Sequence, residues 1–229
     1  AHMLGEVTLA GSDFDVRLVG GRFCGAVSRG RELMPRRQAS SYLRTAGRTH
    51  YYRTISSFSF EDDTGTGLRE ELALDGGEGA AIKVEYSFRA DCPLLSIGVE
   101  VSYPSLAFDV EEYAPFAIAV REMKRGDSAL VEVTAPDDSA STLTVTAESG
   151  PVTWAGASFR VRRADGGWVV LRFGTADTRR WGLASFRVTR IRGERVLEAN
   201  PFGSYSAIPG SSLSGRRESF SLLLGVEDA

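Results

Sequence analysis

Apolar and polar residues alternate along most of the chain, which is the pattern of strands with one buried and one solvent-facing side. No stretch shows helical periodicity for more than about two turns. Gly-bearing sequences such as Asp165-Gly166-Gly167 separate the alternating segments, as hairpin turns do. We therefore predict an all-β fold, a large antiparallel two-sheet β-sandwich. The alternating segments are 14–19, 55–60, 82–88, 95–103, 129–133, 143–146, 159–162, 168–173, 186–188 and 220–224.

The chain of 229 residues is long enough for one large domain or two small ones. The first three residues, Ala1-His2-Met3, have the sequence of a cleaved expression tag and are excluded from the fold. The polar stretch 135–141 could be a linker, but it has the length of an ordinary loop, and alternation resumes on both sides. We predict a single β-sandwich domain over residues 4–229.

Charge and hydropathy argue against two classes of partner. The formal net charge is −3, which does not favour binding to nucleic acid. No window approaches the ~20 consecutive apolar residues of a membrane-spanning helix. We expect neither nucleic acid nor membrane as a partner.

Histidine and cysteine are scarce. His50 is the only histidine outside the tag remnant, so a Ser-His-Asp or Cys-His site must include it. Cys24 and Cys92 lie beside apolar segments and do not complete a zinc ligand set. Their positions favour buried free thiols, although a disulfide between them stays open. We expect no metal site and no cofactor.

Acidic residues offer two further kinds of chemistry. The run 61–67 places carboxylates among glycines, as calcium loops do, but it lacks the spacing of such loops and favours an exposed turn. The pairs Glu70-Glu71 and Glu111-Glu112 would point to opposite faces of a strand, so neither forms a dyad. Acids from distant segments could still converge, which keeps a carboxylate-based hydrolase or lyase as an alternative. No catalytic residue is assigned.

Exposed aromatic rings would suit a sugar, because the apolar face of a sugar ring stacks on them. Trp168 lies in an apolar run and is assigned to the core. One of the neighbours Tyr51 and Tyr52 must point outward if the segment is extended. The candidate glycan-binding residues are Trp154, Trp181, Tyr205 and Tyr52.

Two adjacent segments carry opposite charge. Seven arginines and one acid lie between Arg29 and Arg53, and seven acids and one base lie between Glu61 and Glu78. We expect the two segments to pair within the fold. Pro35 and Gly47 predict a long loop around the arginines, most of them paired with those acids and one or two free for a partner. The candidate partner-facing residues are Arg36, Arg37, Arg44 and Arg48.

Three segments resemble galactose-mutarotase-like β-sandwiches. They are the opening strand and turn that lead into Gly30-Arg31-Glu32-Leu33, the middle pair Tyr86-Ser87-Phe88 and 94–97, and the close at 215–222. The resemblance implies the large sandwich fold, which occurs in mutarotases and in accessory domains of glycoside hydrolases. Mutarotases use histidine and glutamate for proton transfer, whereas His50 has no recognisable partner motif here.

The resemblance therefore implies a non-catalytic accessory domain of a carbohydrate-active enzyme, structural or weakly glycan-binding. Its partners would be carbohydrate or other domains of a parent enzyme. A free-standing carbohydrate-binding module is the second hypothesis. A carboxylate-based glycoside hydrolase or lyase is the third.

Overall fold

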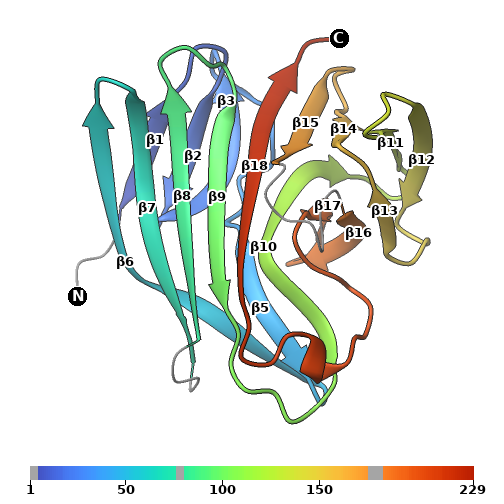
Figure 1. Cartoon of the computed structure of the whole chain (residues 1–229). Helices are drawn as coiled ribbons and strands as arrows, with labels where there is room; N and C mark the ends of the chain where they lie inside the picture. Colours follow the sequence, from blue (N-terminus) through green and yellow to red (C-terminus); the bar gives the residue numbers. More distant parts are fainter. Residues whose placement is uncertain (1–4, 76–79, 175–182) are drawn as a thin grey trace.

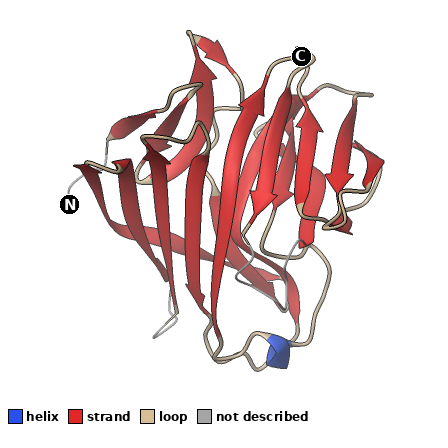
Figure 2. Ribbon diagram, turned by 45° about the horizontal axis from the view of Figure 1, so that its top comes forward, coloured by secondary structure: helices blue, strands red, loops and turns tan. Residues whose placement is uncertain are grey.

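The computed structural model describes residues 5–75, 80–174 and 183–229. Within these ranges the chain is built almost entirely of strands, with one short 3-10 helix, η1 (Gly210–Ser212) (Figures 1 and 2). The strands are β1 (Glu6–Ala10), β2 (Asp15–Val19), β3 (Arg22–Ser28), β4 (Arg31–Glu32), β5 (Ser40–Thr45), β6 (Arg48–Asp62), β7 (Gly65–Leu74), β8 (Ala81–Arg89), β9 (Leu95–Ser102), β10 (Val110–Met123), β11 (Ser128–Thr134), β12 (Ala140–Thr146), β13 (Val152–Ala155), β14 (Ser158–Arg162), β15 (Trp168–Phe173), β16 (Leu183–Ile191), β17 (Glu194–Asn200) and β18 (Arg217–Glu227).

The strands form a small and a large sheet. The small sheet has the order β1-β2-β3-β4, and the large sheet has the order β12-β11-β14-β15-β18-β9-β8-β7-β6-β5-β10-β17-β16-β13. Every strand pairing is antiparallel, for example β8 with β9 and β10 with β17. The long strand β6 crosses the lower part of the molecule to reach β5, and there the large sheet turns back behind β9 and β18 (Figure 1). The predicted fold class, a large antiparallel β-sandwich, is confirmed.

One hydrophobic core extends through the small sheet and both halves of the large sheet. Strand alternation builds it, because every second residue of β8 and β9 is buried while the residues between them face outward. Aromatic rings connect the layers: Tyr86 lies 6.0 Å from Phe116, and Phe159 lies 5.6 Å from Phe186, between ring centroids. No helix among the described residues is long and apolar enough to span a membrane.

Several local predictions can be compared with the structure. Residues 135–141 hold the β11–β12 hairpin loop rather than a linker, since Thr134 pairs with Ala140. The acidic run 61–67 forms the β6–β7 turn, where the Asp62 carboxylate accepts hydrogen bonds from the Thr64 amide and hydroxyl. Both cysteines are free thiols; Cys24 is buried and Cys92 is half-buried. The prediction of a single domain over 4–229 stays a prediction.

Candidate functional site

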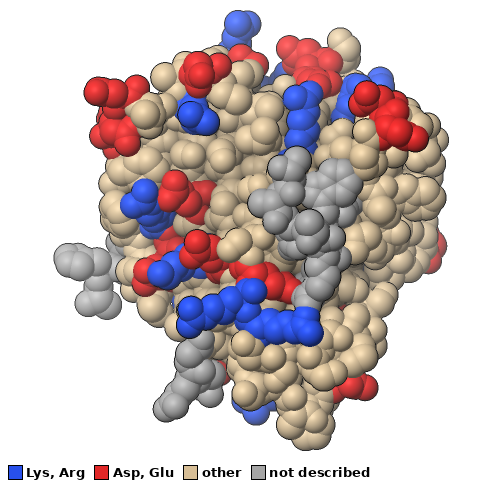
Figure 3. All heavy atoms as spheres, in the orientation of Figure 1, with Lys and Arg blue, Asp and Glu red and all other residues tan. Residues whose placement is uncertain are grey.

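Half of the large sheet has one face on the core and one face open to solvent. Strands β6, β7, β8, β9 and β18 lie side by side there, with the small sheet behind them, and Figure 3 shows the open face. Acidic and basic side chains are interspersed on it over β6 to β9. A groove of about 550 Å³ crosses this face, and we call it the sheet groove. Its outward-facing lining residues are Ser56, Phe58, Arg69, Glu71, Lys83, Glu85, Ser87, Ser96, Gly98, Glu100 and Ser219.

An aromatic wall borders the sheet groove on the β6 side. Phe58 is 55% exposed, and its ring centroid lies 6.5 Å from that of Phe60. The Arg69 guanidinium carbon lies 5.6 Å from the Phe58 ring centroid and 5.0 Å from that of Phe60. Strand β6 has a bulge between Thr54 and Ser56, beside which Ile55 is 65% exposed. An exposed apolar surface therefore lies beside the guanidinium group of Arg69.

Cross-strand register places charges of both signs along the groove. Arg69 lies opposite Glu85 and donates a hydrogen bond to its carboxylate. One row further, Lys83 lies between Glu71 and Glu100 in the register, and its Nζ is 4.0 Å from Glu71 Oε1. Glu100 is exposed and has no ion-pair partner among the described residues. The groove thus offers both hydrogen-bond donors and acceptors to a ligand.

The floor of the sheet groove consists of short side chains. Gly98 lies opposite Glu85 on one side and Ser221 on the other. A Cβ added at Gly98 would meet no atom within 4 Å, so the space above it is open. Ser87 and Ser96 form the next row. A ligand can therefore approach the backbone of β9 closely.

A buried ion pair supports the groove from behind. The carboxylate of Glu70 accepts a hydrogen bond of 2.8 Å from Tyr86 Oη and lies 3.5 Å from Arg22 Nε on β3. Burial raises the pKa of Glu70 despite the cation, and it raises the pKa of Tyr86 as well. Glu70 points into the core and Glu71 outward, as strand geometry predicts for neighbours. The sequence pattern marked Glu70 as an acid on a strand but gave no sign of its partners.

Two acids from distant segments do converge, on the outer face of β10, β16 and β17. The guanidinium of Arg187 lies 3.1 Å from Glu112 Oε1 and 3.7 Å from Glu198 Oε1. Tyr42 and Tyr205 complete the group, which we call the Arg187 network. Tyr205 Oη donates a hydrogen bond of 2.6 Å to the Glu198 carboxylate. The guanidinium carbon of Arg187 lies 3.9 Å from the Tyr205 ring centroid. Burial raises the pKa of Glu198. Each carboxylate in the network is engaged by Arg187 and a tyrosine.

The candidate aromatic residues have different positions. Tyr52 and Tyr205 are only 5% and 7% exposed, so the structure contradicts a stacking role for them: Tyr52 packs in the core and Tyr205 lies in the Arg187 network. Tyr51, the outward neighbour of Tyr52, is exposed instead. Trp154 is 44% exposed on the edge strand β13. Trp181 lies outside the described residues. Phe58 is not among the predicted binding residues. Alternation in 55–60 indicates a strand, but it does not show which face of that strand is open to solvent.

The candidate partner-facing arginines do not share one long loop. Arg36 and Arg37 lie in the connection between β4 and β5, whereas Arg44 and Arg48 belong to the β5–β6 hairpin. Three of these four arginines form ion pairs within the fold, as predicted for most of them, but the prediction that their partners are acids of the segment 61–78 is wrong. Arg36 pairs with Glu6 at 2.6 Å, Arg37 with Glu194, and Arg44 with Glu111 at 3.0 Å. Arg48 is exposed and has no ion-pair partner among the described residues. Among the described residues, the ion pair between Arg53 and Asp75 is the one that joins the two charged segments as predicted.

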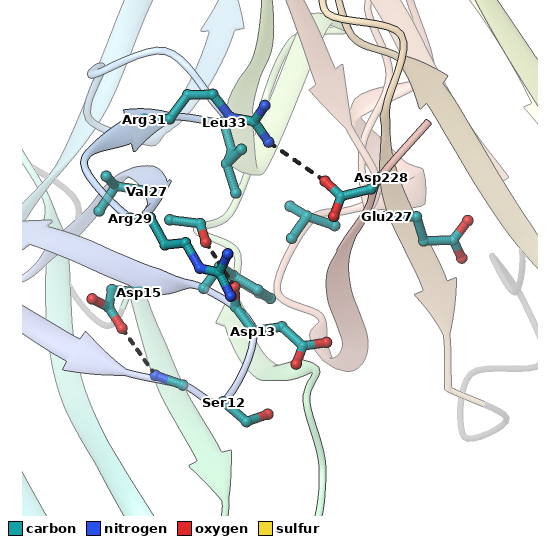
Figure 4. A pocket seen from close by; sticks show the side chains of 13 residues that line it. Ser12, Asp13, Asp15, Val27, Arg29, Arg31, Leu33, Glu227 and Asp228 are labelled. Carbon is teal, nitrogen blue, oxygen red and sulfur yellow. Dashed lines mark hydrogen bonds and ion pairs between the residues drawn. The ribbon is translucent and has the colours of Figure 1, made fainter.

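A second, larger hollow of about 990 Å³ lies between the small sheet and the end of β18. Figure 4 shows Arg31 reaching across it to Asp228, at 3.4 Å, with Arg29 and Asp13 on its other side. Phe14 is the one aromatic residue among its described lining residues, and it is buried. This hollow therefore offers charged groups but no open ring, and it suits a sugar less well than the sheet groove.

Comparison with known proteins gives similarity in fold. No family model matches the chain, and no curated protein matches it by sequence. An α-N-acetylgalactosaminidase from Bifidobacterium bifidum is 13% identical, with a TM-score of 0.57 over 97% of this chain and 36% of that chain. A GH36 α-galactosidase from Geobacillus stearothermophilus, solved with raffinose, is 8% identical, with a TM-score of 0.59 over 97% of this chain and 40% of that chain.

A galactose mutarotase-related enzyme from Lactobacillus acidophilus is 10% identical, with a TM-score of 0.52 over 97% of both chains. The chain thus has the galactose-mutarotase-like β-sandwich fold, as the sequence resemblance implied. It spans 36 to 40% of the length of these two hydrolases.

Proposed function

We propose that this chain is a non-catalytic, glycan-binding β-sandwich domain of a carbohydrate-active enzyme, and that the sheet groove holds the sugar. The observation that carries the proposal is the groove itself, an open face with an exposed phenylalanine, a row of charged groups and a floor of glycine and serine. Its place on a fold shared with glycoside hydrolases supports a carbohydrate as the ligand.

The chemistry of the groove fits a polyhydroxylated ring. The ring of Phe58 can stack on the apolar face of a sugar, while Arg69 beside it donates hydrogen bonds to hydroxyl groups. Glu85, Lys83 and Glu71 add acceptors and donors within one or two strands. A shallow, open site of this kind is suited to binding in the millimolar to micromolar range, which corresponds to roughly 4 to 8 kcal/mol.

Binding rather than catalysis is supported by the pairing of the acids. Two-carboxylate hydrolysis needs one acid to donate a proton and a second to act as base or nucleophile. Glu71 and Glu85 each lie beside a cation, and Glu100 is the one groove carboxylate without such a partner in the described part of the chain. The same holds for the Arg187 network, where Arg187 contacts both acids.

The experiment titrates galactose, N-acetylgalactosamine and raffinose by calorimetry into the wild-type protein and four variants, Gly98→Trp, Phe58→Ala, Gly150→Trp and Trp154→Ala. Gly98→Trp fills the groove from a position where an added Cβ meets no atom within 4 Å, and we expect it to abolish binding. Phe58→Ala removes the stacking platform and is expected to weaken binding about tenfold, or ~1.4 kcal/mol. Gly150→Trp is the matched control, because Gly150 is also open but lies in the β12–β13 loop.

The result that would overturn the proposal is unchanged affinity in Gly98→Trp. Loss of binding in Trp154→Ala, with Gly98→Trp unaffected, would favour a carbohydrate-binding module that uses the β13 edge instead. Absence of binding to a broad glycan array, with all variants folded, would leave a structural domain of a larger enzyme.

A role beside other domains is part of the same proposal. The hydrolases with this fold are more than twice as long as the matched segment. We propose that other domains of a parent enzyme are the protein partners of this chain, with Arg48 as one partner-facing residue that is free for contact.

A further inference from the structure

The β16–β17 hairpin ends in a cluster of arginines. Arg190, Arg192 and Arg195 lie within six residues, and Glu194 is the only acid among them. Arg190 and Arg195 are directly opposite in the strand register, which places their Cβ atoms about 4.5 to 5.5 Å apart. Two like charges in this position repel each other and destabilise the pairing.

Nothing in the described part of the chain compensates these charges. Glu194 is paired with Arg37, and neither Arg190 nor Arg195 has an ion-pair partner or a side-chain hydrogen bond there. Nη1 of Arg195 is buried and has no hydrogen-bond partner. A pair of like charges without a described counter-charge, at the end of a hairpin with Arg190 exposed, is a place where an anion would be stabilised.

We propose that Arg190 and Arg195 form a binding site for a tetrahedral oxyanion, phosphate or sulfate, either free or as a substituent of a sugar. Two guanidinium groups that project from opposite strands can each offer a fork of two N–H donors to one such anion. The anion would cancel the repulsion between the two guanidinium groups. The proposal concerns the hairpin end alone and stands independently of sugar binding in the sheet groove.

Replacing one of these arginines is expected to change the melting temperature in the direction opposite to that expected for an arginine that stabilises the fold. We expect Arg195→Gln and Arg190→Gln to raise the melting temperature in chloride buffer, because each removes the repulsion. In the wild type, millimolar phosphate or sulfate is expected to raise the melting temperature above that in chloride of equal ionic strength. Both variants are expected to lose this added shift, whereas the control Arg48→Gln keeps it.

The source of the anion is tested by calorimetry with inorganic phosphate, glucose 6-phosphate and glucose. Equal affinity for the two phosphates indicates a free anion, and at least tenfold tighter binding of the sugar phosphate indicates a substituted sugar. The proposal is overturned if Arg195→Gln lowers the melting temperature in chloride and the phosphate-induced shift persists. Because Gly98→Trp leaves the hairpin intact, its effect on glycan binding tests the sheet groove separately.

Discussion

The sheet groove and the Arg187 network use the same residue types on two outer faces of one sheet. In the groove, Arg69 pairs with Glu85 across neighbouring strands and contacts the ring of Phe58. In the network, Arg187 lies opposite Glu198 across neighbouring strands and stacks on the ring of Tyr205. The local arrangement of cation, carboxylate and aromatic ring is therefore nearly repeated.

The two regions differ in what covers them. The segment after β17 folds over the network, with Ser204 bridged to Tyr113 and Tyr205 buried against Glu198. No described segment covers the groove, where Phe58 stays exposed and Gly98 has open space above it. The two regions contain the same residue types, so residue type does not determine their roles. The network is buried under a neighbouring segment and stabilises the fold, whereas the groove faces solvent and is available to a ligand.

The largest expected effect is on stability, from Arg187→Met. Loss of the guanidinium leaves Glu112 and Glu198 together without their cation, and removal of one partner of a buried pair costs about 3 kcal/mol. The matched variant Arg69→Met removes an exposed pair and is expected to cost less than ~1 kcal/mol. Urea denaturation measures both. Equal losses of stability in the two variants would show that burial under a neighbouring segment does not distinguish the two regions.

A pH dependence follows from Glu198. Burial raises its pKa in the folded protein above the ordinary value, so the folded state holds its proton more tightly than the unfolded state does. Stability is therefore expected to fall as the pH rises from the ordinary pKa of glutamate through the raised pKa. Glu198→Gln should make the free energy of unfolding less dependent on pH in this window, as measured by denaturation at several pH values. A steeper dependence in the variant would contradict the assignment.

Ligand affinity is expected to respond to Arg69 but not to Arg187. Arg69→Gln keeps a donor but removes the charge and the fork beside Phe58, with an expected loss of about tenfold in affinity for raffinose, or ~1.4 kcal/mol. The network lies on another face, so a folded Glu198→Gln variant should bind raffinose as the wild type does. Calorimetric titration of both variants sharpens the comparison, and equal losses would place the ligand elsewhere.

The smallest effect is expected from the β5–β6 hairpin. Arg44→Glu breaks an exposed pair with Glu111 and should cost about 0.5 kcal/mol. Arg48→Glu breaks no pair with a described residue and should leave stability unchanged. Thermal unfolding of the two variants measures the difference. A large loss from Arg48→Glu would show that this arginine has a structural role.

The sequence predicts the strands well and the sites poorly, for a physical reason. Alternation in 82–88 and 95–103 follows directly from one buried and one exposed face, and both segments are strands. The loop prediction around Arg44 failed because Ala46-Gly47 makes a tight hairpin turn, in which both residues have positive φ. Turn residues alone did not reveal how short that connection is.

The candidate site depends on contacts between segments that are far apart along the chain. Whether Tyr205 or Phe58 is exposed depends on whether a distant segment covers it, and alternation along one strand does not contain that information. The choice between Tyr51 and Tyr52 likewise rests on which face of β6 packs on the core. A pattern along the chain predicts that two faces exist; the packing of the sheets decides which one stays open.

The most direct measurement of the central claim is a raffinose titration followed by backbone amide NMR. If the sheet groove is the binding face, the chemical shift changes will cluster on β7, β8 and β9, with Ser87, Gly98 and Glu100 among the most affected, and Gly98→Trp will remove them. Shift changes concentrated around Trp154 on β13 or in the Arg187 network, with the groove unaffected, would contradict the account.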